Sequence, residues 1–201
     1  MKVLDMTSFS PTHPTLLNTL APSRGIIQAA GFAIGGSLLL ALSAKAQVPF
    51  WPVPMTLQSL VVMMLGMAYG SRLAMATVLL YLAEAAMGLP VLAGAGAGIA
   101  YMTGPTAGYL VGFVLAAGLI GWLAEHSWDR TPVKAVAAMS IGHALLFIPG
   151  VAWLAVLFGF DKAIAVGLAP FYAATLLKTA LGAALMQAAW TVVARRSRDR
   201  A

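Results

Sequence analysis

The sequence predicts an all-α membrane protein, a bundle of six transmembrane helices. Of its 201 residues, 61% are hydrophobic and only 9% are charged, and the mean hydropathy is +0.89. A water-soluble domain of this size would aggregate with so much apolar surface. About six spans of roughly 20 residues, joined by short loops, would use up the chain. No room is left for a soluble catalytic domain.

Six apolar stretches, each bounded by Pro, Gly or charge, lie at approximately 24–46, 56–70, 72–88, 104–124, 134–157 and 170–194. They lack the alternation of strands, and lipid does not tolerate unpaired backbone, so we expect helices. The second and third are short for spans, and Gly70-Ser71-Arg72 predicts a tight hairpin between them. The predicted divisions are an N-terminal arm over 1–23, a membrane domain over 24–194 and a basic tail over 195–201.

The basic residues orient the chain and do not indicate nucleic acid, although the net charge is +6. In an up-and-down arrangement one side carries Lys2, Arg24, Arg72, Arg130, Lys134, Arg195, Arg196, Arg198 and Arg200. The opposite loops, roughly 47–55, 89–103 and 158–169, contain only Lys162 and Asp161 as charged residues. The positive-inside rule therefore places both termini in the cytoplasm. We expect a multi-pass protein of the bacterial cytoplasmic (inner) membrane.

Two of the outer loops are apolar. Residues 48–54 are too rich in proline for a helix and too apolar for a solvated linker, which predicts a lid over the bundle. Residues 89–98 are glycine-rich, but no strand precedes them and no Gly-Lys-Ser or Gly-Lys-Thr follows, which excludes a nucleotide loop. Both a gated outward pocket and connectors anchored at the interface fit these loops.

Lys178 is a candidate site residue because a charge within a span costs about 2.5–3.5 kcal/mol on insertion scales. It lies about eight residues, or roughly 12 Å of helix rise, from the outer end of the sixth helix. Its helix face also carries Phe171, Thr175, Gly182 and Leu185. A ligand contact and an internal ion pair that only fixes packing are both open.

Glu84 is a second candidate, in the outer half of the third helix. Thr77, Tyr81 and Gly88 share its face, which predicts an inward polar stripe. Glu84 and Lys178 could pair when the site is empty, which reduces the cost of each charge. Lys45, at the outer end of the first helix, is expected only to snorkel to the interface.

Nothing in the sequence indicates an enzyme or a cofactor. His143 has Ser140 and Phe147 on its face and serves either packing or ligand binding. No second His or carboxylate stands at i+3 or i+4, so a helix-borne metal site has no support. No nucleophile elbow with a Ser, His and Asp arrangement is visible. The absence of cysteine excludes thiol catalysis and disulfides.

The first helix carries a ladder of small residues at every fourth position: Gly25, Ala29, Ala33, Ser37 and Ala41. Such a ladder lets another helix pack with its backbone close, which is how helices associate in lipid. The partner is either an internal helix or another subunit.

Four motifs resemble the BioY family, the biotin-specific S components of energy-coupling-factor (ECF) transporters. They are Val48-Pro49-Phe50-Trp51-Pro52-Val53-Pro54-Met55-Thr56-Leu57-Gln58, Leu80-Tyr81-Leu82, Gly88-Leu89-Pro90-Val91 and Gly104-Pro105-Thr106-Ala107-Gly108-Tyr109. The resemblance runs from about Gln47 to Lys178. The family often shows Pro-Phe followed by Asp-x-x-Lys in the sixth helix. Pro170, Phe171 and Lys178 match this pattern, whereas Thr175 replaces the Asp, with Glu84 a possible substitute.

The resemblance implies a six-helix subunit that captures biotin from outside and delivers it with a transmembrane coupling subunit and two cytoplasmic ATPases. The chain has no Walker motif, so any ATP hydrolysis belongs to partners. The expected substrate site comprises Lys178, Thr175, Glu84, Tyr81, Trp51, Gln58, Tyr101, Tyr109 and His143, and the expected partner contacts are Ala29, Ala33 and Ser37. Alternatives are an S component for another vitamin, a solitary biotin transporter, or a membrane scaffold without transport activity.

Overall fold

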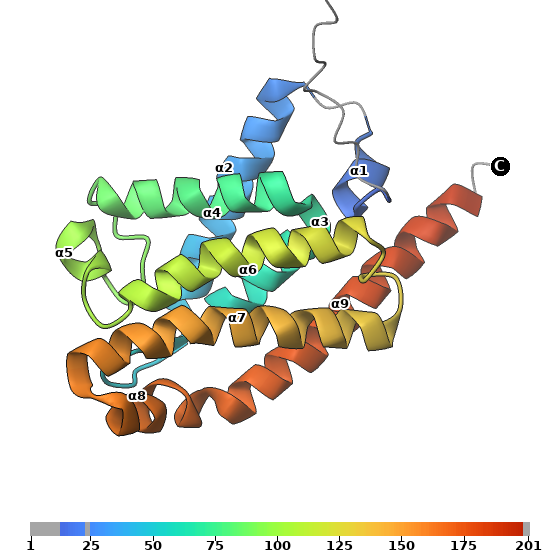
Figure 1. Cartoon of the computed structure of the whole chain (residues 1–201). Coiled ribbons are helices and arrows are strands. Elements are labelled where there is room, and N and C mark those ends of the chain that lie inside the picture. The colour runs from blue at the N-terminus through green and yellow to red at the C-terminus, as the bar shows by residue number, and fades with distance from the viewer. Residues whose placement is uncertain (1–12, 23–24, 199–201) are drawn as a thin grey trace, which may run out of the picture.

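The computed structural model describes residues 13–22 and 25–198 (Figure 1). Most of the predicted arm, Arg24 and the end of the predicted basic tail lie outside the described residues. The helices are α1 Leu16–Leu20, α2 Ile26–Lys45, α3 Gln58–Tyr69, α4 Ser71–Ala86, α5 Gly98–Met102, α6 Ala107–Glu125, α7 Pro132–Phe158, α8 Phe160–Gly167, the 3-10 turn η1 Ala169–Phe171, and α9 Tyr172–Arg198. Two short strands, β1 Gln47–Val48 and β2 Met55–Thr56, pair antiparallel.

All six predicted stretches form helices, namely α2, α3, α4, α6, α7 and α9. The predicted hairpin is confirmed: α3 ends at Tyr69, α4 begins at Ser71, and Gly70 between them has a φ of +82°, which glycine adopts at little cost. Within the described part of the chain, four helical stretches are long and apolar enough to cross a membrane: Ile26–Lys45, Ala107–Glu125, Pro132–Phe158 and Phe160–Arg196. The chain is therefore a multi-pass membrane protein. With 12 and 16 residues, α3 and α4 are shorter, so the count of six spans stays a prediction.

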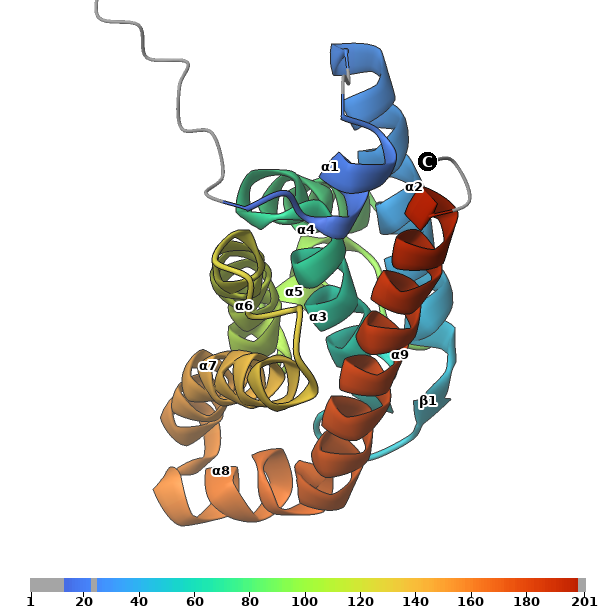
Figure 2. The same cartoon turned by 90° about the vertical axis from the view of Figure 1, so that its right-hand side faces the viewer.

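The helices surround α3, which packs against α1, α2, α4, α6, α7 and α9. In Figure 1, α4, α6 and α7 lie side by side, and Figure 2 shows α2 and α9 on the other side of α3. Three inward residues of α3, Val62, Met63 and Met67, have no exposed surface. A helix that is apolar all round must be buried on most sides, as α3 is.

Two glycines bring α6 and α7 into main-chain contact. A Cβ at Gly108 would collide with the carbonyl of Pro149, and a Cβ at Gly112 would collide with the carbonyl of Leu146. Small residues allow this close approach between membrane helices. Trp153 adds a hydrogen bond from its Nε1 to the carbonyl of Gly104 at 2.9 Å. The position of the inward residues of α6 therefore depends on Gly108 and Gly112.

Charged and aromatic side chains meet at one end of the bundle. In Figure 1, α5 and α8 lie at the left end, and α1 and the last turns of α9 lie at the right end. At the right end the Arg130 guanidinium stacks 3.5 Å from the ring centre of Trp190. Trp190 Nε1 in turn donates to the Asp129 carboxylate at 2.8 Å. These contacts join the loop between α6 and α7 to α9.

Residues 48–54 lie over the end of the bundle that carries α5 and α8, as predicted for a lid. They are framed by a short hairpin, which the sequence did not indicate. Gln47 pairs with Thr56, and Val48 pairs with Met55. The ring of Phe50 lies 6.5 Å from that of Phe171. The hairpin therefore brings the proline-rich segment back over the start of α9.

Candidate functional site

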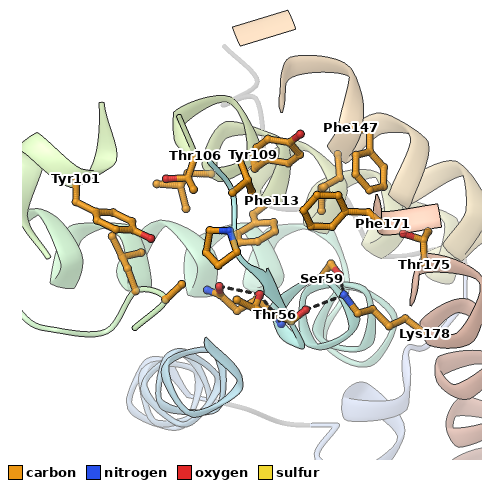
Figure 3. Close-up of a pocket in the computed structure, with 17 residues that line it drawn as sticks. Thr56, Ser59, Tyr101, Thr106, Tyr109, Phe113, Phe147, Phe171, Thr175 and Lys178 are labelled. Atoms are coloured by element: carbon orange, nitrogen blue, oxygen red, sulfur yellow. Dashed lines mark hydrogen bonds between the residues drawn. The ribbon is translucent and has the colours of Figure 1, made fainter. Parts of the chain in front are cut away.

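A pocket opens among α3, α6, α7, α9 and the loops at the end that carries α5 and α8. It encloses about 590 Å³ of space not filled by protein atoms, including solvent at its mouth. The part of it that admits the centre of a water molecule measures about 60 Å³, so the pocket is narrow as it stands. The lining residues are Val53, Pro54, Thr56, Gln58, Ser59, Leu92, Ala93, Tyr101, Thr106, Tyr109, Leu110, Phe113, Leu146, Phe147, Phe171, Thr175 and Lys178. Figure 3 shows Tyr101 at one end of this pocket and Lys178 at the other.

Lys178 supplies the positive charge of the pocket. Its side chain is only 8% exposed, and its Nζ donates to the Thr56 carbonyl at 2.7 Å and to Ser59 Oγ at 3.0 Å. An ammonium has three N–H donors, so these two bonds leave one for a ligand. Thr175 lines the pocket one turn before Lys178. The predicted face of α9 is thus correct for Thr175 and Lys178, whereas Leu185 is 45% exposed.

An aromatic wall faces this polar corner. The ring of Phe147 lies 6.1 Å from Tyr109 and 6.0 Å from Phe171, both edge to face, and Phe113 continues the wall (Figure 3). The Tyr109 hydroxyl is fixed by donating to the Gly167 carbonyl at 2.7 Å. Such a wall covers a flat apolar ring system, because aromatic side chains bury large area with few rotatable bonds.

Gln58 forms the floor of the pocket and Tyr81 lies behind it. Gln58 Nε2 donates to the Tyr81 hydroxyl at 2.6 Å, and Gln58 Oε1 accepts from Thr56 Oγ1 at 3.0 Å. The Tyr81 hydroxyl donates to the Val91 carbonyl at 2.9 Å. Tyr81 has no exposed surface, so it orients Gln58 and does not line the pocket itself.

Tyr101 comes from the short helix α5, and Thr106 lies just before α6; both line the pocket mouth. Burial raises the pKa of Tyr101 above its ordinary value, although a hydrogen bond with Thr106 opposes the shift. The phenol is therefore neutral at physiological pH. It can both donate and accept a hydrogen bond.

Besides Tyr81, three predicted site residues do not line the pocket: Glu84, Trp51 and His143. Glu84 accepts from Ser37 Oγ at 2.9 Å, because it faces α2 and not α9. Trp51 is 71% exposed and packs against Phe158, with ring centres 5.8 Å apart. The expected pairing of Glu84 with Lys178 is absent, since each has other partners.

His143 is buried and does not line the pocket. It is 2% exposed, and its Nδ1 lies 2.9 Å from the Met139 carbonyl and 3.2 Å from Thr179 Oγ1. It therefore joins α7 to α9 behind the lining residues. Among residues 13–22 and 25–198, no group of three or more His, Cys, Asp or Glu side chains is placed to hold a metal ion.

The small-residue ladder of α2 is only partly available to another protein. Ser37 has no exposed surface and is bonded to Glu84, so it cannot contact a partner subunit as placed here. Ala29 and Ala33 are half-buried. Of the ladder residues expected to contact a partner, only Ser37 is fully buried, and it contacts α4 of the same chain through Glu84.

Sequence reasoning missed several lining residues: Ser59, Thr106, Phe113 and Phe147. Ser59 lies on α3, Phe113 on α6 and Phe147 on α7, and Thr106 lies just before α6. The surfaces of these helices are apolar on every side. Hydrophobic periodicity therefore could not identify their inward face. Ser59 had one available signal, since it directly follows the Gln58 motif.

The geometry defines an integral membrane protein with a small-molecule pocket open toward one end of its helix bundle. The model of the BioY family matches residues 14–195, and the chain belongs to that family.

Curated relatives agree with this assignment, and a solved structure shares the fold. The probable biotin transporter BioY of Pyrococcus horikoshii is 34% identical over 142 residues, covering 71% of this chain and 83% of that protein. The biotin transporter BioY of Rhizobium etli is 37% identical over 158 residues, covering 74% and 84%. A crystal structure of an S-component for biotin from an ECF-type ABC transporter superposes with a TM-score of 0.72 over 82% of this chain and 93% of that one. At 21% identity, this last likeness shows the fold alone.

Proposed function

We propose that this chain is a biotin-binding membrane subunit that mediates biotin uptake. The observation that carries the proposal is the pocket, in which one buried ammonium, from Lys178, stands opposite an aromatic wall. The names of its curated relatives, which are biotin transporters, support the choice of ligand.

Biotin suits this pocket chemically. Its fused rings are flat and apolar enough to lie against Tyr109, Phe147 and Phe171, and its ureido and carboxylate groups need hydrogen-bonding partners. Lys178 offers a charged donor, Thr175 a hydroxyl, and Gln58 an amide. The remaining N–H of the buried Lys178 ammonium favours a ligand that offers a hydrogen-bond acceptor at this end of the pocket.

The energy for transport comes, in this proposal, from a transmembrane coupling subunit and two cytoplasmic ATPases, because the chain has no Walker motif. The chain crosses the bacterial cytoplasmic membrane six times with both termini inside. Arg130 and Lys134 at one end of the bundle and the nearly uncharged loops at the other support this orientation.

Biotin is expected to stabilise the purified protein without ATP, since a ligand that binds only the native state raises the free energy of unfolding. At a free biotin concentration 100 times Kd, the gain is about 2.7 kcal/mol. The measurement is the melting temperature in detergent with and without biotin, with a chemically unrelated vitamin as control. An unchanged melting temperature at saturating biotin would reject the proposed ligand.

Ala33→Trp, and likewise Ala29→Trp, should weaken copurification of a coupling subunit and leave biotin affinity within about twofold. A bulky side chain holds helices apart on a small-residue face, and neither alanine lines the pocket. Leu38→Trp is the matched control, because Leu38 is 58% exposed on the same helix. If biotin affinity and melting temperature fall together in the alanine variants, these residues serve internal packing and not partner binding.

A further inference from the structure

Lys45, the last residue of α2, makes an unusual set of contacts. Its Nζ donates to three main-chain carbonyls: Pro90 at 2.6 Å, Leu92 at 2.9 Å and Gly94 at 2.6 Å. An ammonium has three N–H donors, so each has its own protein acceptor. A lysine that only snorkels leaves its ammonium to water. The expectation that Lys45 only snorkels is therefore wrong.

The three carbonyls belong to the loop between α4 and α5, residues 88–97, which we name the 88–97 loop. Within it Leu92 N donates to the Gly96 carbonyl at 3.2 Å, and Gly96 N donates to the Ala93 carbonyl at 3.0 Å. Gly94 has a φ of +61°, which helps the chain turn its carbonyl toward the same centre as those of Pro90 and Leu92. The loop thus bends around the ammonium of a different helix.

The 88–97 loop is also part of the pocket. Leu92 and Ala93 line the pocket, and Leu92 is only 1% exposed. Next to Leu92, the Val91 carbonyl accepts from the Tyr81 hydroxyl, which in turn binds Gln58. The loop is therefore tied to α2 through Lys45 and to the pocket floor through Tyr81.

We propose that Lys45 is a positioning residue that holds the 88–97 loop in place as a wall of the ligand pocket and so slows ligand release. Without the ammonium, three carbonyl oxygens would converge with no donor between them. They would turn toward water, and Leu92 would lose its place. The proposal rests on the proposed function only for its effect on biotin; the order of the loop can be measured without any ligand.

The test compares Lys45→Met, Lys45→Arg and the parent by hydrogen exchange of the ligand-free proteins. We expect the amides of Leu92 and Gly96 to exchange about tenfold faster in Lys45→Met, while α3 and α6 keep their protection. Lys45→Arg should lose protection as well, because a planar guanidinium cannot direct N–H donors to three carbonyls that converge on a single nitrogen. Lys162→Met is the matched control, since Lys162 lies over the rings of Trp51 and Phe158 and away from this loop.

Chemical rescue separates the bonding role from a general loss of stability. In Lys45→Ala, added n-propylammonium should restore protection of the 88–97 loop, whereas tetramethylammonium, which has the same charge and no N–H donor, should not. Biotin dissociation should be about tenfold faster in Lys45→Met, with association nearly unchanged.

Unchanged loop exchange in a folded Lys45→Met protein would overturn the proposal. So would a loss of protection spread evenly over all helices, or equal rescue by both cations. Failure of the parent protein to bind biotin would refute the proposed function and leave the loop measurement valid.

Discussion

Lys178→Met is expected to weaken biotin binding by about 30-fold or more, with little change in melting temperature. The substitution keeps length and packing but removes a charge-assisted hydrogen bond to the ligand, for which a loss of about 2–5 kcal/mol is reasonable. The variant leaves the Thr56 carbonyl and the Ser59 hydroxyl without this donor, but it also removes the cost of burying a charge, so the two effects on stability oppose each other. Isothermal titration of biotin, beside melting curves, measures both quantities.

Two further variants sharpen this test. Lys162→Met removes a lysine at the same end of the bundle that does not line the pocket, and should bind biotin like the parent. Adding Glu84→Gln to Lys178→Met should restore neither affinity nor stability, because Glu84 is bonded to Ser37. A stable Lys178→Met protein with the parent's affinity would remove Lys178 from the site.

Biotin methyl ester identifies the end of the ligand that Lys178 contacts. If Lys178 binds the carboxylate, Lys178→Met should weaken biotin much more than its ester. If it binds the ureido oxygen, both ligands should weaken alike. Equal affinity of parent and variant for both compounds would contradict either contact.

Gly108→Ala is expected to lower the free energy of unfolding by about 1–3 kcal/mol or more, and to reduce biotin affinity as well. The added Cβ meets the main chain of Pro149, which can move only if α6 and α7 separate. Tyr109, the next residue, would then shift from the aromatic wall.

Gly118→Ala is the matched control on the same helix. Its added Cβ meets the flexible side chain of Met75, and alanine is favoured over glycine within a helix by up to about 1 kcal/mol. We expect its melting temperature to equal or exceed that of the parent. Equal destabilisation by both substitutions would mean that main-chain contact at Gly108 is not what sets the distance between α6 and α7.

The elements of the fold were largely predictable because lipid imposes simple constraints on sequence. Apolar length and breaks such as Gly70 located the helices α2, α3, α4, α6, α7 and α9. The hairpin of Gln47–Val48 with Met55–Thr56 was not predictable, since two paired residues on each strand give no alternation to detect. The short helices α5 and α8 were missed because they lie in loops between spans.

Site residues were predictable where a charged side chain within a span costs free energy. They were not predictable where the role of the residue depends on its hydrogen-bond partner in the fold. Lys178 was found because an intramembrane charge calls for an explanation. Glu84 satisfied the same rule, yet its partner is Ser37, and helix periodicity does not say which neighbour a face meets. Lys45 was misjudged for a related reason: its acceptors are main-chain carbonyls of a distant loop, which no side-chain pattern records.

Equilibrium binding of labelled biotin to the purified chain measures whether this chain alone forms a biotin site. The protein is assayed in detergent without nucleotide and without partner subunits. We expect saturable binding of one biotin per chain, displaced by unlabelled biotin but not by an unrelated vitamin. A folded protein that binds no biotin, or that releases the label equally to any vitamin, would contradict it.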